Sequence, residues 1–399
     1  MTRTGDLRRY LSYVVPFEDM TRDIWLICFS NIIGAFGEGL YFWVFPLYVR
    51  YLQADYVQLG LVFSALYGVS ALAPLPGGLL ADRFDRKKIL ILAWTPWALS
   101  PLLYSFAANW TQLIPGTVLW GISVIGVPAA NAYIITSVAD KKRLASVISF
   151  VWSTYSLSYV FAPTVGVYLA DMIGMQWVLR VSAVLTGVAT SIFFLLHSQH
   201  PRRMNTEKQN GRQSSSGRKT LLRKLLVWSC FLTLISFFMG IARPYVPTFL
   251  AENVHMSEFL VGLFGSINFV GVTLIGIATG RLGDKWSKSK VISLCLAFYI
   301  MSMVPLLLIR EPVALLPIAF LYGGSSVSGF LVSSYVGGIA PENKRGLWSS
   351  VPQTLSLVAS FVAPYVGGYL YTRSPYDAFL VSVGAAPLLA VLALTLLRE

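Results

Sequence analysis

Two charged side chains lie where a charge is costly, in the middle of long apolar runs. Of the 18 acidic residues, only Glu38 lies deep inside such a run, in NIIGAFGEGLYFWVFP (31–46). Arg243, in FFMGIARPYVP, is the only deep basic residue. A carboxyl group removed from water favours its protonated form, whereas one beside a guanidinium stays ionised. These residue types therefore predict either a site that takes up and releases a proton or an ion pair that opens and closes.

The spacing of the two residues leaves both chemistries open. An internal offset of 201 residues places Arg243 opposite Phe42, one helical turn beyond Glu38. One turn is about 5.4 Å, a distance that an arginine side chain can span. A paired Glu38 would form a gate, an unpaired Glu38 among aromatic neighbours would carry a proton, and a pair that breaks on opening would combine the two. A static structural pair is the remaining interpretation.

The elements that must position these residues are apolar runs of membrane-crossing length. The chain is 55% hydrophobic and only 12% charged, whereas a soluble domain carries about 25% charged residues. Twelve runs reach the roughly twenty residues that cross a bilayer. In lipid they must be helices, because every backbone polar group needs an internal partner. We therefore predict an all-α integral membrane protein with twelve transmembrane helices, at about 24–50, 57–81, 88–107, 111–138, 144–170, 177–197, 225–250, 257–282, 290–309, 313–339, 347–371 and 376–396.

The net charge of +13 indicates orientation in the membrane and not nucleic-acid binding. With the N-terminus inside, 26 of the 31 Lys and Arg residues fall on the cytoplasmic side, which is the positive-inside bias. Only Arg50, Arg180, Arg310 and Arg373 fall outside. We predict that both termini are cytoplasmic, that the protein lies in the plasma (inner) membrane, that basic loops contact anionic lipid, and that nucleic acid is no partner.

The sequence offers few residues that could bind a metal or catalyse a reaction. Cys28, Cys230 and Cys295 lie in apolar runs at unrelated spacings and read as small hydrophobic residues. The three histidines are scattered near span ends or in loops, and neither a nucleotide-binding loop nor an HExxH motif occurs. We expect no metal, no cofactor and no enzymatic activity.

The chain repeats itself on the two sides of a basic linker. GLVFSALYGVSALAPLPGGLLADR (60–83) aligns without gaps on GLFGSINFVGVTLIGIATGRLGDK (262–285), and APTVGVYL (162–169) aligns on APYVGGYL (363–370). Matched glycine, proline and aspartate at a nearly constant offset indicate a duplicated six-helix unit. We predict a cytoplasmic N-terminal segment (1–23), a six-helix bundle (24–197), a cytoplasmic linker (198–224) and a second, pseudo-symmetric six-helix bundle (225–399).

Charge gathers between the second and third predicted helices. Six of the seven residues from Asp82 to Lys88 are charged, directly after an uncharged run. Gly78, just before them, would let another backbone come close. An acid at this boundary can face a helix N-terminus, and the basic residues can bind carboxylates, lipid phosphates or helix C-termini. A simple positive-inside stop between two helices is the alternative.

This cluster resembles the signature G-x-x-x-D-R-x-G-R-[RK] of the major facilitator superfamily, with Asp85 where the family usually has glycine. With the twelve runs and the duplicated halves, the resemblance covers essentially the whole chain. It implies a secondary active transporter that works by alternating access, usually as a monomer, on a small-molecule substrate. It also implies that the cluster latches the two halves together on the cytoplasmic side. The latch candidates are Gly78, Asp82, Arg83, Arg86, Lys87, Arg143, Gly280, Asp284 and Lys285.

A second stretch, SLSYVFAPTVGVYLA (156–170), resembles the G-x-x-x-G-P-x-x-G-G signature of the twelve-helix drug/proton antiporter-like branch. Proline bends a helix, and glycines allow the close packing that keeps ions from leaking. A packing kink without a role in coupling is the alternative. The arginine that this branch carries in its fourth helix is missing, and Thr117 takes about that position. The residues retained in the stretch and in its symmetric copy are Pro163, Gly166, Pro364, Gly367 and Gly368.

Helices 1, 4, 7 and 10 line the cavity in this superfamily, with contributions from 5, 8 and 11. The chain's 55 Phe, Trp and Tyr residues indicate a mostly apolar pocket that suits amphiphilic solutes. We expect proton-coupled efflux. The alternative is an uptake porter or uniporter for a carboxylate or neutral solute, with Glu38 and Arg243 as an outer gate. For each polar cavity candidate, bonding between helices is the alternative role; they are Asn31, Trp120, Asn131, Tyr155, Asn268, Tyr335 and Gln353.

Overall fold

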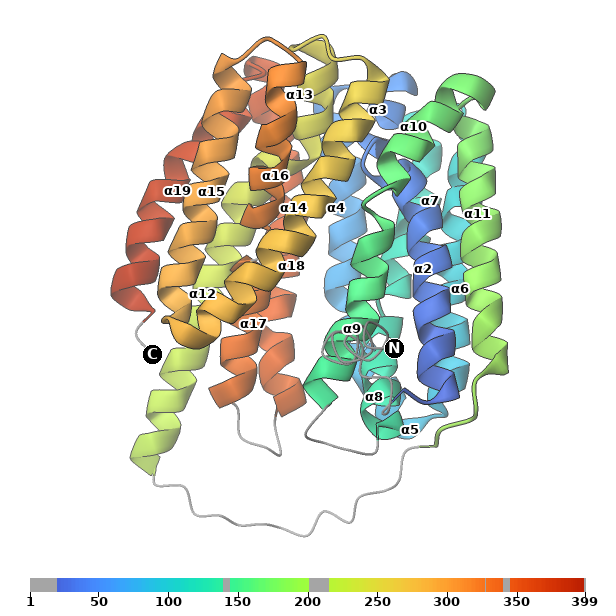
Figure 1. Cartoon of the computed structure of the whole chain (residues 1–399), viewed down its shortest axis with the longest axis vertical. Helices are drawn as coiled ribbons and strands as arrows, with labels where there is room; N and C mark the ends of the chain where they lie inside the picture. The colour runs from blue at the N-terminus through green and yellow to red at the C-terminus, as the bar shows by residue number, and fades with distance from the viewer. Residues whose placement is uncertain (1–19, 139–143, 201–214, 327, 340–344, 398–399) are drawn as a thin grey trace, which may run out of the picture.

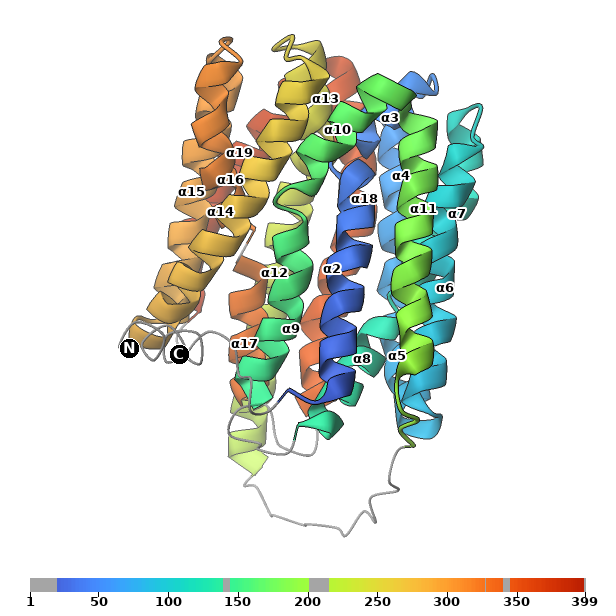
Figure 2. The ribbon, with the colours of Figure 1, turned by 45° about the vertical axis from the view of Figure 1, so that its right-hand side comes forward.

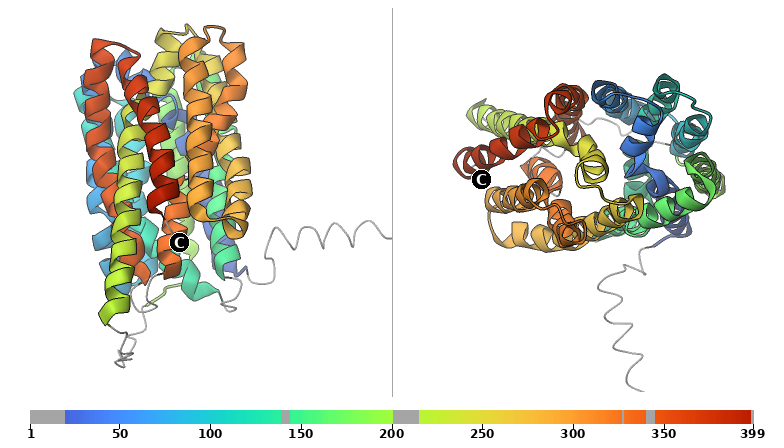
Figure 3. Two further views of the ribbon diagram at one scale, coloured as in Figure 1. Left: turned by 90° about the vertical axis from the view of Figure 1, so that its left-hand side faces the viewer. Right: turned by 90° about the horizontal axis from the view of Figure 1, so that it is seen from above.

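Helices make up nearly all of the chain that the computed structural model describes, which covers residues 20–138, 144–200, 215–326, 328–339 and 345–397. No β-strand occurs within these ranges. The long helices run roughly side by side, and from above they form two groups (Figures 1 and 3). The prediction of an all-α protein is confirmed.

The first group consists of the helices that precede residue 200, with α2 inside it, flanked by α9, α10 and α11 (Figure 2). Its elements are α2 (Arg22–Phe42), α3 (Phe45–Tyr51), α4 (Tyr56–Leu72), α5 (Pro74–Arg83), α6 (Arg86–Ser105), η2 (Trp110–Gln112), α7 (Leu113–Ser123), α8 (Gly126–Ser137), α9 (Leu144–Ser158), α10 (Ala162–Ile173), α11 (Met175–Ile192) and η3 (Phe193–Leu195).

The second group begins with the long helix that follows residue 214. Its elements are α12 (Ser215–Ala242), η4 (Arg243–Tyr245), α13 (Val246–Glu252), α14 (Glu258–Lys285), α15 (Lys288–Leu308), η5 (Val313–Leu315), α16 (Leu316–Ser325), α17 (Ser328–Ile339), α18 (Arg345–Arg373) and α19 (Asp377–Leu396).

Ten helical segments among the described residues are long and apolar enough to cross a membrane. They coincide with ten of the twelve predicted runs. The other two runs correspond to α6, which opens with three basic residues, and to 313–339, which is divided between α16 and α17. The count of twelve spans and the side of both termini therefore stay predictions.

Proline sets where several helices begin, and the pattern recurs in both groups. A proline occupies the first turn of α3 and of α13, where its missing N–H costs nothing. The two helices have the same length, and each bound of α13 lies 201 residues after its counterpart in α3. The repeat differs at Pro74, which starts α5 as a separate helix. The matching α14, with Gly276 at that position, runs unbroken.

The two groups meet at the end of the molecule that carries α3 and α13, at the top of Figure 1. Trp43 Nε1 donates to the Val261 carbonyl at 2.9 Å, and the hydroxyls of Thr164 and Ser266 lie 2.7 Å apart. The hydrogen bonds and ion pairs that join the two groups through described residues all lie toward this end. This end is closed by direct contact in the present conformation.

Candidate functional site

The carboxylate of Glu38 lies inside the first helix group and is only 1% exposed. Trp97 Nε1 of α6 donates to it at 3.1 Å, Trp120 Nε1 of α7 at 2.8 Å and the Tyr155 hydroxyl of α9 at 2.6 Å. All three donors are neutral groups. Small residues on α2 make room for them, because a Cβ at Gly34 would lie 2.3 Å from the Trp97 ring.

The surroundings of Glu38 permit a change of protonation. None of the ion pairs between described residues involves Glu38. Indole N–H groups can only donate, whereas the Tyr155 hydroxyl can also accept from a protonated carboxyl. That hydroxyl lies 3.4 Å from the hydroxyl of Tyr159, whose ring packs 4.7 Å from Phe269 of the second helix group. A chain of contacts through two tyrosines therefore leads from Glu38 to the place where the groups meet.

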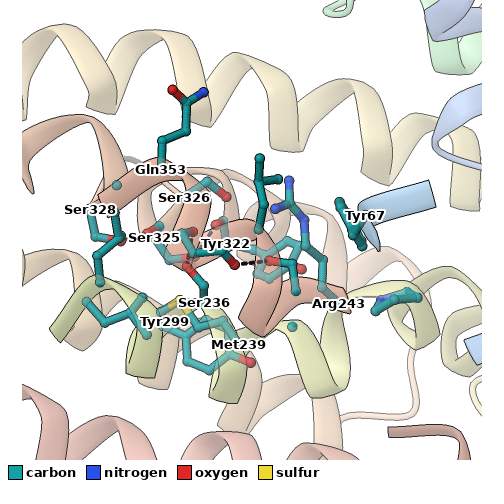
Figure 4. A pocket seen from close by; sticks show the side chains of 18 residues that line it. Tyr67, Ser236, Met239, Arg243, Tyr299, Tyr322, Ser325, Ser326, Ser328 and Gln353 are labelled. Carbon is teal, nitrogen blue, oxygen red and sulfur yellow. Dashed lines mark hydrogen bonds between the residues drawn. The ribbon is translucent and has the colours of Figure 1, made fainter. Parts of the chain in front are cut away.

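Arg243 lies in η4, at the end of α12, and does not pair with Glu38 in this structure. Its exposed side chain lines a cavity of about 440 Å³ that is formed mainly by the second helix group. Tyr67 of α4 reaches the cavity from the first group and lies beside Arg243 (Figure 4). The two charges noted in the sequence thus lie in separate environments.

The wall of this cavity is rich in hydroxyl groups, most of which are already bonded. Ser236 and Ser356 bond to each other at 2.6 Å, and Ser325 donates to the Tyr322 carbonyl at 2.6 Å. The described lining residues are Tyr67, Leu232, Ile235, Ser236, Met239, Gly240, Arg243, Pro244, Tyr299, Tyr322, Ser325, Ser326, Ser328, Gly329, Gln353, Ser356, Leu357 and Ser360.

The seven predicted cavity residues lie in three kinds of place: beside Glu38, in the wall of the cavity around Arg243, and between packed helices. Trp120 and Tyr155 bind Glu38, and Gln353 lines the cavity around Arg243. The other four lie elsewhere: Asn31 and Asn131 bond to a neighbouring helix, which is the alternative role, whereas the hydroxyl of Tyr335 and the side-chain oxygen of Asn268 are buried without such a bond. Asn31 donates to the Val151 carbonyl, Asn131 accepts from Trp152, Tyr335 stacks on Trp228 at 3.8 Å, and Asn268 is buried with its side-chain oxygen unpaired.

Sequence reasoning missed Trp97 and Tyr159 near Glu38 and the serine-rich wall around Arg243. The N–H of Trp97 in the apolar stretch AWTPWALSP was the available signal, since a buried indole usually finds an acceptor. The serines did not by themselves indicate a cavity wall, because a serine in a membrane helix can bond to its own backbone.

An ion pair closes the α3/α13 end. Arg50 Nε donates to Glu252 Oε1 at 3.0 Å, and the Tyr56 hydroxyl donates to Glu252 Oε2 at 2.7 Å. The Arg50 guanidinium also lies over the Tyr56 ring, 4.1 Å from its centroid. Tyr245 completes the closure by donating to the carbonyls of Tyr56 and Pro364 at 3.1 and 2.7 Å.

Glu252→Gln is expected to open this end in a larger fraction of molecules. The side chains of Arg50 and Glu252 are 28% and 33% exposed, so we expect about 0–1 kcal/mol, or up to roughly a fivefold population shift. Spin labels at Tyr51 and His255, in a background with serine for cysteine, would report the distance between the groups. Glu311→Gln, an exposed acid in the second group, is the matched control. An unchanged distance distribution would contradict the role of the pair.

The predicted kink residues provide close helix contacts. α9 ends at Ser158 and α10 starts at Ala162 with Pro163 in its first turn, whereas α18 continues through Pro364. A Cβ at Gly166 would lie 1.7 Å from the Leu40 carbonyl oxygen. In α18, a Cβ at Gly367 would lie 2.1 Å from the Ile241 carbonyl oxygen, and one at Gly368 would lie 2.5 Å from that of Tyr56.

The charged cluster after α5 binds within its own helix group. Arg86 donates to the Ala132 carbonyl at 3.1 Å, and Lys87 Nζ donates to the Phe194 carbonyl at 2.8 Å. Asp82 and Arg83 are exposed and make no bond to the second group through described residues. Arg143 and the side chain of Asp284 lie outside the described residues, while Lys285 is exposed. The latch therefore stays a prediction.

Comparison with known proteins identifies the family of this chain. The profile described as Major Facilitator Superfamily matches residues 27–243 and 233–399. The chain belongs to the major facilitator superfamily. It is a multi-pass integral membrane protein of a transporter family, and the resemblance proposed from its sequence is confirmed.

Its superfamily relatives include multidrug resistance proteins, which agrees with the resemblance to the drug/proton antiporter branch. Multidrug resistance protein MdtG of Yersinia enterocolitica is 28% identical over 318 residues, which cover 75% of this chain and 74% of that protein. Multidrug resistance protein 2 of Bacillus subtilis is 22% identical over 374 residues, covering 90% and 91%. A mutant of the nucleoside transporter NupG has the same fold, with a TM-score of 0.76 at 14% identity, covering 94% of this chain and 100% of that one.

Within the superfamily signature, the prediction of a close approach at Gly78 is wrong. A Cβ there would meet nothing within 4 Å, and the same holds at Gly280. The neighbouring Gly77 makes the contact, because its Cβ would lie 2.4 Å from the Ile125 carbonyl oxygen at the break between α7 and α8. The residue next in sequence faces another direction on the helix, which explains the difference.

Asp85, which replaces the usual superfamily glycine, caps α6. Its φ of −58° needs no glycine, and its side chain accepts from the backbone N–H groups of Lys87 and Gln199 at 3.1 and 3.0 Å. Burial by itself raises the pKa of Asp85, but these hydrogen bonds outweigh it and hold the pKa below its ordinary value. The substitution thus fastens the α5–α6 turn to the segment after η3.

Asp85→Ala is expected to destabilise the protein by about 1 kcal/mol at neutral pH through loss of the cap. Because the folded-state pKa is depressed, this stabilisation is full above the unfolded pKa of about 3.9 and is lost as the pH falls through the folded value. Thermal unfolding of the detergent-solubilised protein between neutral and acid pH would measure both effects. Asp85→Asn keeps a capping side chain and should retain most of the stability without the pH dependence. Equal stability of the parent and the alanine variant at neutral pH would contradict the capping role.

Proposed function

We propose that the protein is a proton-coupled exporter of small amphiphilic organic solutes. Its twelve transmembrane helices lie in a plasma (inner) membrane with both termini cytoplasmic, and it works as a monomer in contact with anionic lipid. The two bundles, 24–197 and 225–399, rock about a central cavity. With this orientation the closed α3/α13 end is the outer end, and the present conformation faces inward.

The observation that carries the proposal is the binding of Glu38 by three neutral donors from three other helices. An acid at mid-membrane costs about 2.5–3.5 kcal/mol on insertion scales, which makes it a functional candidate by default. A guanidinium beside it would hold it ionised, but Arg243 faces a different cavity. Glu38 is therefore free to change charge as access alternates, and we assign it the proton site.

The direction of transport rests on the relatives. Two of them are named as multidrug resistance proteins, and a transporter that lowers the drug level inside a cell must export the drug. In the outward-facing state we expect Asp82 and Arg83 to engage the second bundle, with Arg143, Asp284 and Lys285 as partners in the cytoplasmic latch.

The proposal is tested by transport in everted membrane vesicles energised acid-inside and offered a panel of fluorescent amphiphiles. We expect vesicles with the protein to accumulate at least one dye, and a protonophore to abolish the accumulation. Vesicles without the protein provide the background. A lack of accumulation across the panel, together with a lack of substrate-linked proton flux, would contradict proton-coupled efflux.

The second candidate is an uptake porter or uniporter for a carboxylate or neutral solute. The unpaired Arg243 in the cavity favours a carboxylate. The Glu38–Arg243 outer gate that this alternative assumed is not formed, although the outer end is closed, and Arg50 with Glu252 takes its place. Accumulation of a carboxylate in right-side-out vesicles without a proton gradient would favour this candidate.

A further inference from the structure

We propose that Arg243 and the cavity around it bind the anionic group of the substrate, and that the substrates are small amphiphiles with a single carboxylate. The inference rests on the proposed transport function, because it takes this cavity as the substrate site. It goes beyond that function by naming the substrate class and the residue that recognises it.

The first support is the uncompensated charge of Arg243. It is the only charged residue among the described residues that line the cavity. Its guanidinium makes no hydrogen bond or ion pair with any described residue. The side chain is exposed to the cavity, so its donors are open to a solute that enters. A planar guanidinium offers a fork of donors that matches a carboxylate, so an incoming anion would supply the missing partner.

The second support is the state of the polar groups near it. Ser236, Ser325 and Ser356 already bond within the protein. Ser326 and Gln353, which also line the cavity, make no side-chain hydrogen bond to a described residue. A hydroxyl and an amide N–H₂ are both donors that a carboxylate can accept from. The free groups of this cavity thus include several donors but no acidic group that could bind a cation.

The third support is the shape and composition of the remaining wall. Leu232, Ile235, Met239 and Leu357 present apolar surface, and the Met239 side chain is adaptable. The volume of about 440 Å³ lies within the roughly 300–1,000 Å³ typical of small-molecule sites. One cation with such a wall fits a solute with one anionic group and an apolar body.

The anion site is separate from the proposed proton site. Glu38 does not line the cavity and keeps its own three donors. Tyr67 belongs to α4 of the first helix group, yet it lines the cavity beside Arg243 (Figure 4). A bound anion would therefore contact both helix groups without displacing the proton on Glu38.

The test is equilibrium binding of 1-pyrenebutyric acid and its methyl ester to the full-length protein in detergent, followed by pyrene fluorescence anisotropy. The two probes differ in the charge of one group. We expect the parent to bind the acid about ten- to a hundredfold more tightly than the ester, as for loss of a charge-assisted hydrogen bond. Arg243→Gln should remove this preference by weakening binding of the acid far more than binding of the ester, and Arg243→Lys should keep part of it.

Arg373→Gln is the matched control, because Arg373 is exposed at the end of α18 and does not line the cavity. Retained ester binding shows that a variant is folded. If Arg243→Gln does not bind the ester, Arg243→Lys and Ser326→Ala are measured in its place. Each of them is expected to prefer the acid over the ester less than the parent does. The proposal is overturned if the parent binds no acid, binds both probes equally, or keeps its preference in Arg243→Gln. None of these outcomes bears on proton-driven export in vesicles, which is measured separately.

Discussion

Glu38→Gln is expected to abolish uphill, proton-driven accumulation while leaving downhill movement of the same substrate intact. The amide cannot exchange a proton, but it matches the carboxyl in size and can still accept from Trp97 or Trp120. For the parent, one coupled proton and one pH unit support about tenfold accumulation, since 1.4 kcal/mol corresponds to a factor of ten. The variant should reach a ratio of one. The measurement is dye uptake in everted vesicles with and without an imposed pH gradient, alongside counterflow at equal pH.

Two further variants show whether an effect of Glu38→Gln reports coupling or folding. Glu258→Gln makes the same chemical change at the first residue of α14, where the acid is exposed, and it should behave like the parent. Tyr155→Phe removes the one donor that can also accept a hydrogen bond from a protonated Glu38, so we expect weaker coupling with normal counterflow. Full gradient-driven accumulation by Glu38→Gln would remove Glu38 from the proton pathway.

Gly166→Ala is expected to destabilise the first helix group strongly. The added methyl would lie 1.7 Å from the Leu40 carbonyl oxygen, so α10 and α2 must move apart. Overpacking of this kind costs about 1–3 kcal/mol, occasionally more. The apparent melting temperature in detergent should fall, and transport should fall with it, because the two helices must keep their spacing as the bundles rock.

The matched control is Gly187→Ala on α11, where a Cβ meets nothing within 4 Å. Glycine inside a helix costs about 0.5–1 kcal/mol relative to alanine, so this variant should melt slightly higher than the parent. The two identical substitutions thus have opposite expected signs. A melting temperature of Gly166→Ala at or above that of the parent would show that α2 and α10 relax freely, and would contradict the packing role.

The physics of single segments explains what could be predicted before the fold was known. Removing a backbone polar group from water into lipid has the same cost wherever the segment lies, so apolar length alone predicted the helices. The same cost marks Glu38, because one carboxyl in a long apolar run needs a reason to be there. The offset of about 201 residues, noted in the sequence, recurs in the bounds of α3 and α13, although the sequence had predicted each of them as part of a longer run.

Other features depended on which way each helix faces, and the sequence alone does not set this for helices that are apolar all round. Neighbouring positions on a helix point about 100° apart, so the close contact falls to Gly77 and not to Gly78. The partners of Glu38 come from 59 to 117 residues away, and only packing brings them together. Packing likewise places Arg243 in a cavity of its own, although helix spacing had allowed a pair. The sequence by itself determined the membrane class and the repeat, and it singled out the two charges as candidates. The tertiary structure alone decided their partners, because side-chain contacts between helices depend on rotation and crossing, which no single segment encodes.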